Sequence, residues 1–310
     1  SLILEGAVAV APAILRMLTR HADDFMYGAL FADAVVAKNL ARPDEHCHSW
    51  AVARALLSDA HGQGDAREAF ALGYVAHLGA DVVAHNHMVP QLLITHFGAK
   101  RAGHVYWEAR ADQRFLEQRP EIARLWDDLA RRKFKAHDRF LAARLTPTLF
   151  PNRVSAGIFR RTLGVMQRET WRRAVGRIDA LSSLALDQDT LLKWRALALE
   201  ASRKAVNNPF SARLDSLDPT GEKALRLAAL ARRTLRKRQR RGGEGLDEML
   251  RRALTRVRFV DINLFEPDDP RDQRRLRVIL AQAVEYLRGT FFYRVAEPVA
   301  EPEDLRTLFL

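Results

Sequence analysis

The chain has 310 residues and a net charge of +12, with 48% hydrophobic and 28% charged residues. This composition can form a sizeable core and excludes wholesale disorder. The longest apolar stretch, residues 7–15, is shorter than the roughly 20 residues that a transmembrane helix needs. The single cysteine, Cys47, excludes a disulfide scaffold and a cysteine-rich zinc module.

Apolar residues recur at spacings of three and four almost throughout, and strong helix formers dominate, so the sequence predicts an all-α fold. We expect helices over residues 2–20, 22–38, 48–60, 65–86, 101–117, 120–145, 154–182, 188–206, 219–240, 244–258 and 270–295. Proline and glycine motifs predict breaks between them, among them His61-Gly62-Gln63-Gly64, Val89-Pro90, Asn207-Asn208-Pro209, Asp218-Pro219 and Gly242-Gly243.

Charge and histidine are distributed unevenly along the chain. Residues 1–100 carry 7 Lys and Arg against 10 Asp and Glu, so residues 101–310 carry a net charge of +15. All 10 histidines lie at or before His137, and the most basic stretch has seven positive charges within residues 232–241. We therefore predict a metal-binding helical domain over residues 1–150 and a basic helical region of unknown function over residues 151–310.

The helix predicted over residues 65–86 carries the clearest chemical signal. His77 and Asp81 lie about 40° apart on one face of a regular helix, so both can reach a single cation. Their surroundings are apolar, and a carboxylate in such surroundings needs a partner, which a metal ion provides. Gly73 and Gly79 each cost about 1 kcal/mol of helix stability relative to alanine. They therefore indicate close packing of another helix.

Further residues of metal-ligand type lie on either side of this helix: Asp33 in an apolar stretch, His48 at a helix start, His87 six residues after Asp81, and His104 with Glu108 on one helix face. All offer nitrogen or oxygen donors, which suit zinc in catalytic sites. Their joint occurrence favours a multi-metal site over isolated core histidines and surface ion pairs. His85 competes with His87 for the ligand position, and His46 competes with His48. The remaining histidines have no partner at ligand spacing: His21, His61, His96 and His137.

This pattern resembles the zinc-dependent phospholipase C family, whose wider superfamily includes the S1/P1-type nucleases. The resemblance is carried by His77-Leu-Gly-Ala-Asp81, by His87, by His104-x3-Glu108 and by the segment 28–33. It implies an all-α phospholipase C/P1 nuclease-like bundle, here with additional C-terminal helices, that binds zinc.

The resemblance also implies a distribution of ligands. One zinc ion would be held by Asp33, His48, His77 and Asp81; a second zinc ion would be held by His87, His104 and Glu108. Asp81 would bridge the first zinc to a third, which in the family also takes an N-terminal tryptophan and an early histidine. This chain begins at Ser1, inside the first predicted helix, so we expect those ligands upstream of it and two to three zinc ions in all. No signal peptide is visible; loss of an N-terminal segment from an exported bacterial protein is one interpretation of this start.

The predicted chemistry is phosphodiester hydrolysis, in which a zinc-activated water attacks phosphorus in line and Asp33 is the candidate general base. The expected substrate is a phospholipid or another phosphodiester. The arginine-rich half fits an anionic membrane surface as a partner and, less well, nucleic acid. Two alternatives remain: an S1/P1-type nuclease using the same zinc cluster, and a non-catalytic helical protein that binds membranes or nucleic acid.

Overall fold

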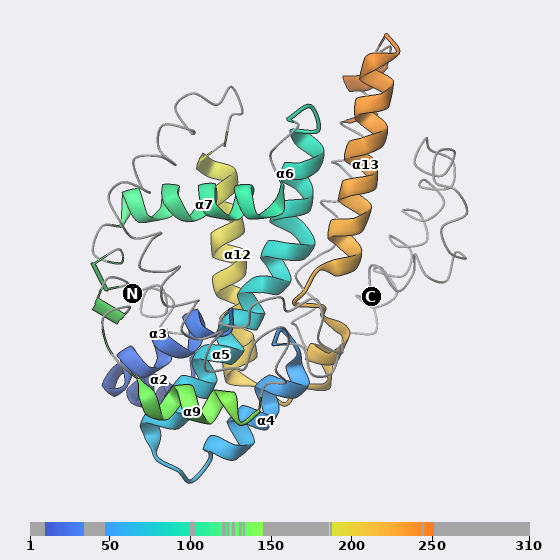
Figure 1. Cartoon of the computed structure of the whole chain (residues 1–310). Helices are drawn as coiled ribbons and strands as arrows, with labels where there is room; N and C mark the ends of the chain where they lie inside the picture. Colours follow the sequence, from blue (N-terminus) through green and yellow to red (C-terminus); the bar gives the residue numbers. More distant parts are fainter. Residues whose placement is uncertain are drawn as a thin grey trace. The chain divides into compact units, whose positions relative to one another are not determined.

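The computed structural model describes residues 10–33, 47–99, 103–119, 134–144 and 188–242, together with short pieces between residues 122 and 132 and isolated positions up to residue 250. Every regular element in these ranges is helical, which confirms the all-α prediction (Figure 1). None of the described helices is both long enough and apolar enough to cross a bilayer.

The described α-helices are α2 Pro12–Arg20, α3 Ala22–Phe31, α4 Trp50–Ala60, α5 Asp65–Val83, α6 Val89–Thr95, α7 His104–Gln118, α9 Lys135–Ala142, α12 Gln188–Asn207 and α13 Glu222–Arg240. A π-helical turn, Ala84–Met88, joins α5 to α6, and a 3-10 turn, Ala212–Ser216, precedes α13. The helices predicted over 154–182 and 270–295, and most of the one over 244–258, lie outside the described residues.

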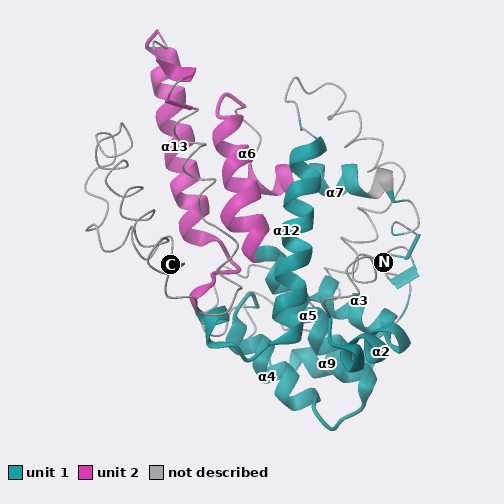
Figure 2. Ribbon diagram, turned by 180° about the vertical axis from the view of Figure 1, so that it is seen from behind, with its two compact units in different colours: residues 1–81, 109–215 teal, residues 82–108, 216–310 magenta. Residues whose placement is uncertain are grey.

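The chain forms two compact units (Figure 2). The first unit contains residues 1–81 and 109–215, and the second contains residues 82–108 and 216–310. The unit boundaries fall within α5, α7 and the 3-10 turn. The seam predicted near residue 150 lies outside the described residues, so the division into domains 1–150 and 151–310 stays a prediction.

In the first unit, α3 and α5 cross with their backbones in direct contact at two glycines. A Cβ atom built on Gly28 would collide with the carbonyl of Phe70, and one on Gly73 would lie within 3.0 Å of the backbone at Phe25 and Ala29. Only glycine fits such an approach, because any other residue would push the helices apart. The close packing that Gly73 indicated is therefore confirmed, and its partner is α3.

The same unit packs α12 against the last turns of α5. A Cβ atom on Gly79 would meet the backbone at Ala201 and Ser202 at 2.9–3.0 Å. The Ser202 hydroxyl donates to the backbone carbonyl of Ala76 at 2.7 Å. The two glycines of α5 thus each receive a neighbouring helix, and these contacts fix the helix that carries His77.

The second unit consists of the π-helical turn, α6, α13 and the start of α7. α13 packs along α6 and the turn (Figure 2). The Arg236 guanidinium donates to the backbone carbonyls of Phe97 and Ala99, at the end of α6. These bonds anchor the basic helix α13 to its neighbour.

The break predicted at Val89-Pro90 is wrong, because the chain stays helical through this proline. Pro90 lacks the amide hydrogen that would bond Asn86 in a regular helix. The π-helical turn changes the pairing before the proline, and Val89 donates to the carbonyl of Ala84. Pro90 then stands in the first turn of α6, where no such hydrogen bond is required.

Candidate metal centre

Three elements of the first unit bring the first predicted ligand set together. Asp33 follows α3, which ends at Phe31 and not at residue 38 as the sequence predicted. His48 precedes Ser49, the N-cap of α4, whose hydroxyl accepts from the Ala51 amide. His77 lies one turn before Asp81 on α5, where the predicted spacing places both on one face.

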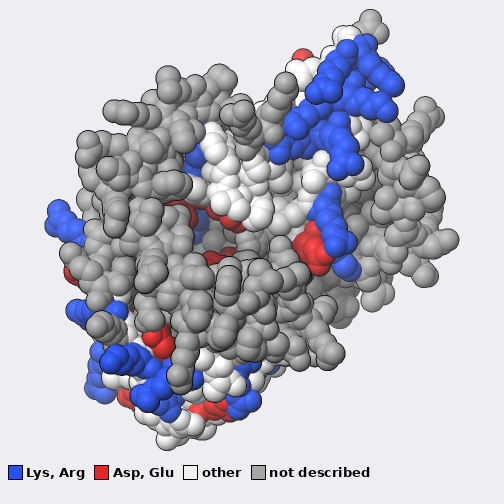
Figure 3. Space-filling view, viewed as in Figure 1, with Lys and Arg blue, Asp and Glu red and all other residues white. Residues whose placement is uncertain are grey.

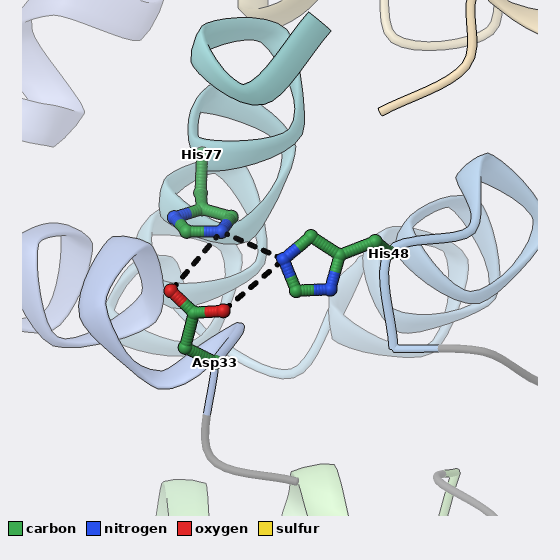
Figure 4. Close-up of side chains that lie close together, drawn as sticks. All are labelled: Asp33, His48 and His77. Carbon is green, nitrogen blue, oxygen red and sulfur yellow. Dashed lines mark hydrogen bonds and ion pairs between the residues drawn. The ribbon is translucent and has the colours of Figure 1, made fainter. Parts of the chain in front are cut away.

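The carboxylates of Asp33 and Asp81 both lie close to the imidazole nitrogens of His48 and His77. His48 Nε2 lies 3.2 Å from His77 Nε2, and the side chains of Asp33, His48 and His77 point toward one another (Figure 4). Asp81 Oδ2 lies 2.9 Å from His48 Nε2 and 3.0 Å from His77 Nε2. Asp33 lies 3.2 Å from His48 Nε2 through Oδ1 and 3.7 Å from His77 Nε2 through Oδ2.

These separations fit a tetrahedral metal ion. Zinc binds nitrogen and oxygen ligands at about 2.0–2.1 Å, which places neighbouring ligand atoms of a tetrahedron about 3.3 Å apart. The measured separations of 2.9–3.7 Å bracket that value. In the part of the chain that the structure describes, Asp33, His48 and His77 form the group of three whose ligand atoms can hold a metal ion.

Burial and charge differ among the four side chains. His48 is 1% exposed, whereas the side chain of Asp33 is 44% exposed. Burial acts to lower the pKa of His48, but hydrogen bonds to Asp33 and Asp81 outweigh it, and the pKa stands well above its usual value. Without a metal, these carboxylates therefore favour a positive charge at His48. A metal cation bound between His48 and these carboxylates would balance their negative charge in the same way.

Two residues behind His48 lie outside the predicted ligand set. Cys47 Sγ lies 3.1 Å from His48 Nδ1 and so contacts the ring nitrogen that faces away from the cluster. The Tyr74 hydroxyl donates to the backbone carbonyl of Cys47, and burial raises the pKa of that hydroxyl well above its usual value. Tyr74 lies three residues before His77 on α5, so helix spacing already places it near the site.

The second predicted ligand set lies in the second unit. Glu108 Oε2 is 3.9 Å from His104 Nε2, as the spacing of four residues on α7 predicts. Glu108 Oε1 is 2.8 Å from His85 Nε2, so His85 contacts this set as well. His87 is buried, and burial lowers its pKa to about 4. Because the two sets belong to different units, their convergence stays a prediction.

The other histidines have different surroundings. His137 Nε2 lies 2.7 Å from Asp24 Oδ1, and its ring stacks on Phe70 at 4.5 Å between centroids. His21 lies 3.4 Å from Asp24 as well, although no ligand spacing in the sequence indicated either contact. His46, the alternative to His48, lies outside the described residues.

Comparisons with known proteins address the resemblance directly. Residues 2–150 match the family model described as zinc dependent phospholipase C. No curated protein matches the chain, and no solved structure does so either. The matched range contains all seven predicted ligands and ends where the predicted metal-binding domain ends. Residues 2–150 of this chain therefore belong to the zinc-dependent phospholipase C family.

Proposed function

We propose that this protein is a zinc-dependent phosphodiester hydrolase that acts on a phospholipid. The observation that carries the proposal is the cluster of Asp33, His48, His77 and Asp81, in which carboxylate oxygens of both aspartates lie 2.9–3.7 Å from the two imidazole nitrogens. The family match supports zinc as the metal ion and a phospholipid as the substrate.

The four residues of this cluster would have different roles in the reaction, because their exposure to solvent differs. When bound, zinc lowers the pKa of a coordinated water and neutralises charge on the phosphodiester oxygens. The two imidazoles and Asp81 are largely buried and would hold the ion. Asp33 is the most exposed of the four, so its carboxylate would both complete the ligand set and accept a proton from the attacking water.

A second zinc ion would be held by Glu108 and His104 together with a histidine of the π-helical turn, for which the family spacing names His87. Asp81 has a second carboxylate oxygen and would bridge the first zinc to a third. A zinc ion held by these residues would neutralise charge on the phosphodiester oxygens. This arrangement is common to the hydrolysis of phospholipids and of nucleic acids, so the substrate needs a separate test.

The outer face of α13 supports an anionic membrane surface as a partner. Lys and Arg side chains gather along this helix (Figure 3). At about 100° per residue, the exposed Arg233, Lys237 and Arg240 share one face. Each basic residue near an anionic surface contributes about 1 kcal/mol, so the three together would strengthen binding by about two orders of magnitude.

The substrate class is tested by assaying zinc-loaded protein on phosphatidylcholine, a chromogenic phosphodiester and single-stranded DNA. We expect cleavage of phosphatidylcholine and the chromogenic ester, and loss of both activities in His77→Ala. The matched control is His61→Ala, because His61 is exposed and lies at the end of α4. Cleavage of DNA alone would favour the nuclease alternative, and zinc binding without any cleavage would favour the non-catalytic one.

A further inference from the structure

His85 makes a polar contact through each of its ring nitrogens. Nδ1 lies 2.7 Å from the backbone carbonyl oxygen of Pro219, and Nε2 lies 2.8 Å from Glu108 Oε1. A carbonyl oxygen can only accept a hydrogen bond, so Nδ1 carries the proton. In a neutral imidazole Nε2 is then an acceptor, and it faces the oxygen of a carboxylate. Two acceptors at this distance repel each other unless a cation lies between them, either a second proton or a metal ion.

The turn that offers the Pro219 carbonyl is held in place around His85. Asp218 Oδ1 accepts from the amide and the hydroxyl of Thr220, at 2.9 and 2.6 Å. Asn86 Nδ2 donates to the backbone carbonyl of Asp218 at 2.6 Å. Gly221 has a φ of 57°, and a Cβ atom there would collide with His85. Glycine therefore allows the turn to approach the imidazole closely.

A hydrogen bond from the second ring nitrogen to a backbone carbonyl, like that of His85 to Pro219, is typical of histidines that bind metals. A metal-bound imidazole usually donates its other N–H to a backbone carbonyl or a carboxylate, which fixes the tautomer and the orientation of the ring. We propose that His85, in place of His87, is the imidazole ligand that joins Glu108 and His104 at the second metal site. This inference rests on the proposed function for the identity of the metal, which we take to be zinc.

The remaining members of the site are compatible with this assignment. Glu108 directs one carboxylate oxygen toward His85 and the other toward His104, whose ring lies 6.4 Å from that of His85 between centroids. His104 is 49% exposed, so its side chain has room to turn toward the same ion. His87 is buried and, in this assignment, does not bind the ion.

The π-helical turn explains why the ligand departs from the family spacing. Residues 84–88 follow i→i+5 hydrogen bonding, so successive side chains turn by less than the 100° of a regular helix. The side chains of His85 and His87 therefore point in directions that differ from those in a regular α-helix. Turns of this kind occur frequently at functional sites.

The test counts zinc ions on metal-free protein that has been reloaded with zinc and passed over a desalting column. We expect His85→Ala to bind about one zinc ion fewer than the unmodified protein, while His87→Ala binds the full number. The control His61→Ala should also bind the full number. Circular dichroism of the metal-free variants checks the fold, and His85→Gln takes the place of the alanine variant if that variant does not fold.

The inference is overturned if His85→Ala and His85→Gln keep the full zinc content, because the cation beside Glu108 is then a proton. It is also overturned if His87→Ala loses a zinc ion, since the family spacing would then hold. Phosphodiester hydrolysis measured on the same samples separates this outcome from the proposed function. An inactive protein that shows the expected zinc pattern would refute the proposed function and leave the His85 assignment intact.

Discussion

Replacing Gly73 with alanine tests whether the crossing of α3 and α5 positions the first metal set. The new methyl group would lie 2.9 Å from the Ala29 amide nitrogen and still closer to the carbonyl oxygen of Phe25. Cβ atoms essentially never come within 3.0 Å of another heavy atom, so the two helices have to separate by roughly 1 Å. Overpacking of this kind costs about 1–3 kcal/mol, whereas the gain in helix propensity is about 1 kcal/mol.

We therefore expect Gly73→Ala to lower the free energy of unfolding of the metal-free protein by up to about 2 kcal/mol. Asp33 follows α3, and a displacement of roughly 1 Å is half of a zinc–oxygen bond length. We expect zinc affinity at the first site to fall by at least about tenfold, as for other changes that misorient a ligand. Urea unfolding measures the stability, and competition with a chelator of known affinity measures zinc binding.

Gly98→Ala is the matched control for this prediction. A methyl group at Gly98 would have Gln239 Oε1 as its nearest neighbour, at 3.9 Å, which is an ordinary contact. This variant should keep both the stability and the zinc affinity of the unmodified protein. If Gly73→Ala matched the control in both measurements, the crossing would not position Asp33 and the structural account of the site would be wrong.

Three further perturbations test other parts of the account. Asp81→Asn keeps the side-chain shape but removes the negative charge that lies beside both His48 and His77. Zinc content and hydrolysis should therefore fall, while the circular dichroism spectrum stays unchanged. Full activity with full zinc content would show that Asp81 is only an ion-pair partner of the histidines. Ser202→Ala removes the bond to Ala76 and should lower the free energy of unfolding by about 1 kcal/mol without loss of zinc; a zinc-deficient variant would contradict this. Replacing Arg233, Lys237 and Arg240 of the α13 face with glutamine should lower the affinity for phosphatidylserine vesicles by about two orders of magnitude, as measured by sedimentation. The control replaces three exposed basic residues of the first unit with glutamine: Arg16, Arg20 and Lys135. Unchanged vesicle binding would rule out this face as the contact, and loss of DNA binding alone would point to nucleic acid.

Only part of the first predicted ligand set follows from local geometry, because Asp33 and His48 were assigned to it from the family resemblance. His77 and Asp81 lie on a regular helix, where a separation of four residues fixes a common face. Gly73 indicated that another helix packs closely on this one, but its partner is set by tertiary contacts, which no local pattern specifies. The contact of Cys47 with His48 was missed because it depends on the turn before α4.

The second set was harder to predict because helix periodicity fails there. The sequence pattern of residues 65–86 continues the spacing of a regular helix, and Pro90 was taken as its end. The structure instead changes hydrogen bonding at Ala84–Met88, and no residue type marks such a turn. The distinction between His85 and His87 therefore depends on a feature that only the backbone conformation reveals.

The central claim is that the cluster of Asp33, His48, His77 and Asp81 binds zinc for phosphodiester hydrolysis. Its most direct test is a titration of metal-free protein with zinc in which hydrolysis of phosphatidylcholine and bound zinc are measured on the same samples. We predict that activity is absent without zinc, rises as the site fills, and is not restored by zinc in His77→Ala. Equal hydrolysis by the metal-free protein, or by zinc-loaded His77→Ala, would contradict the account.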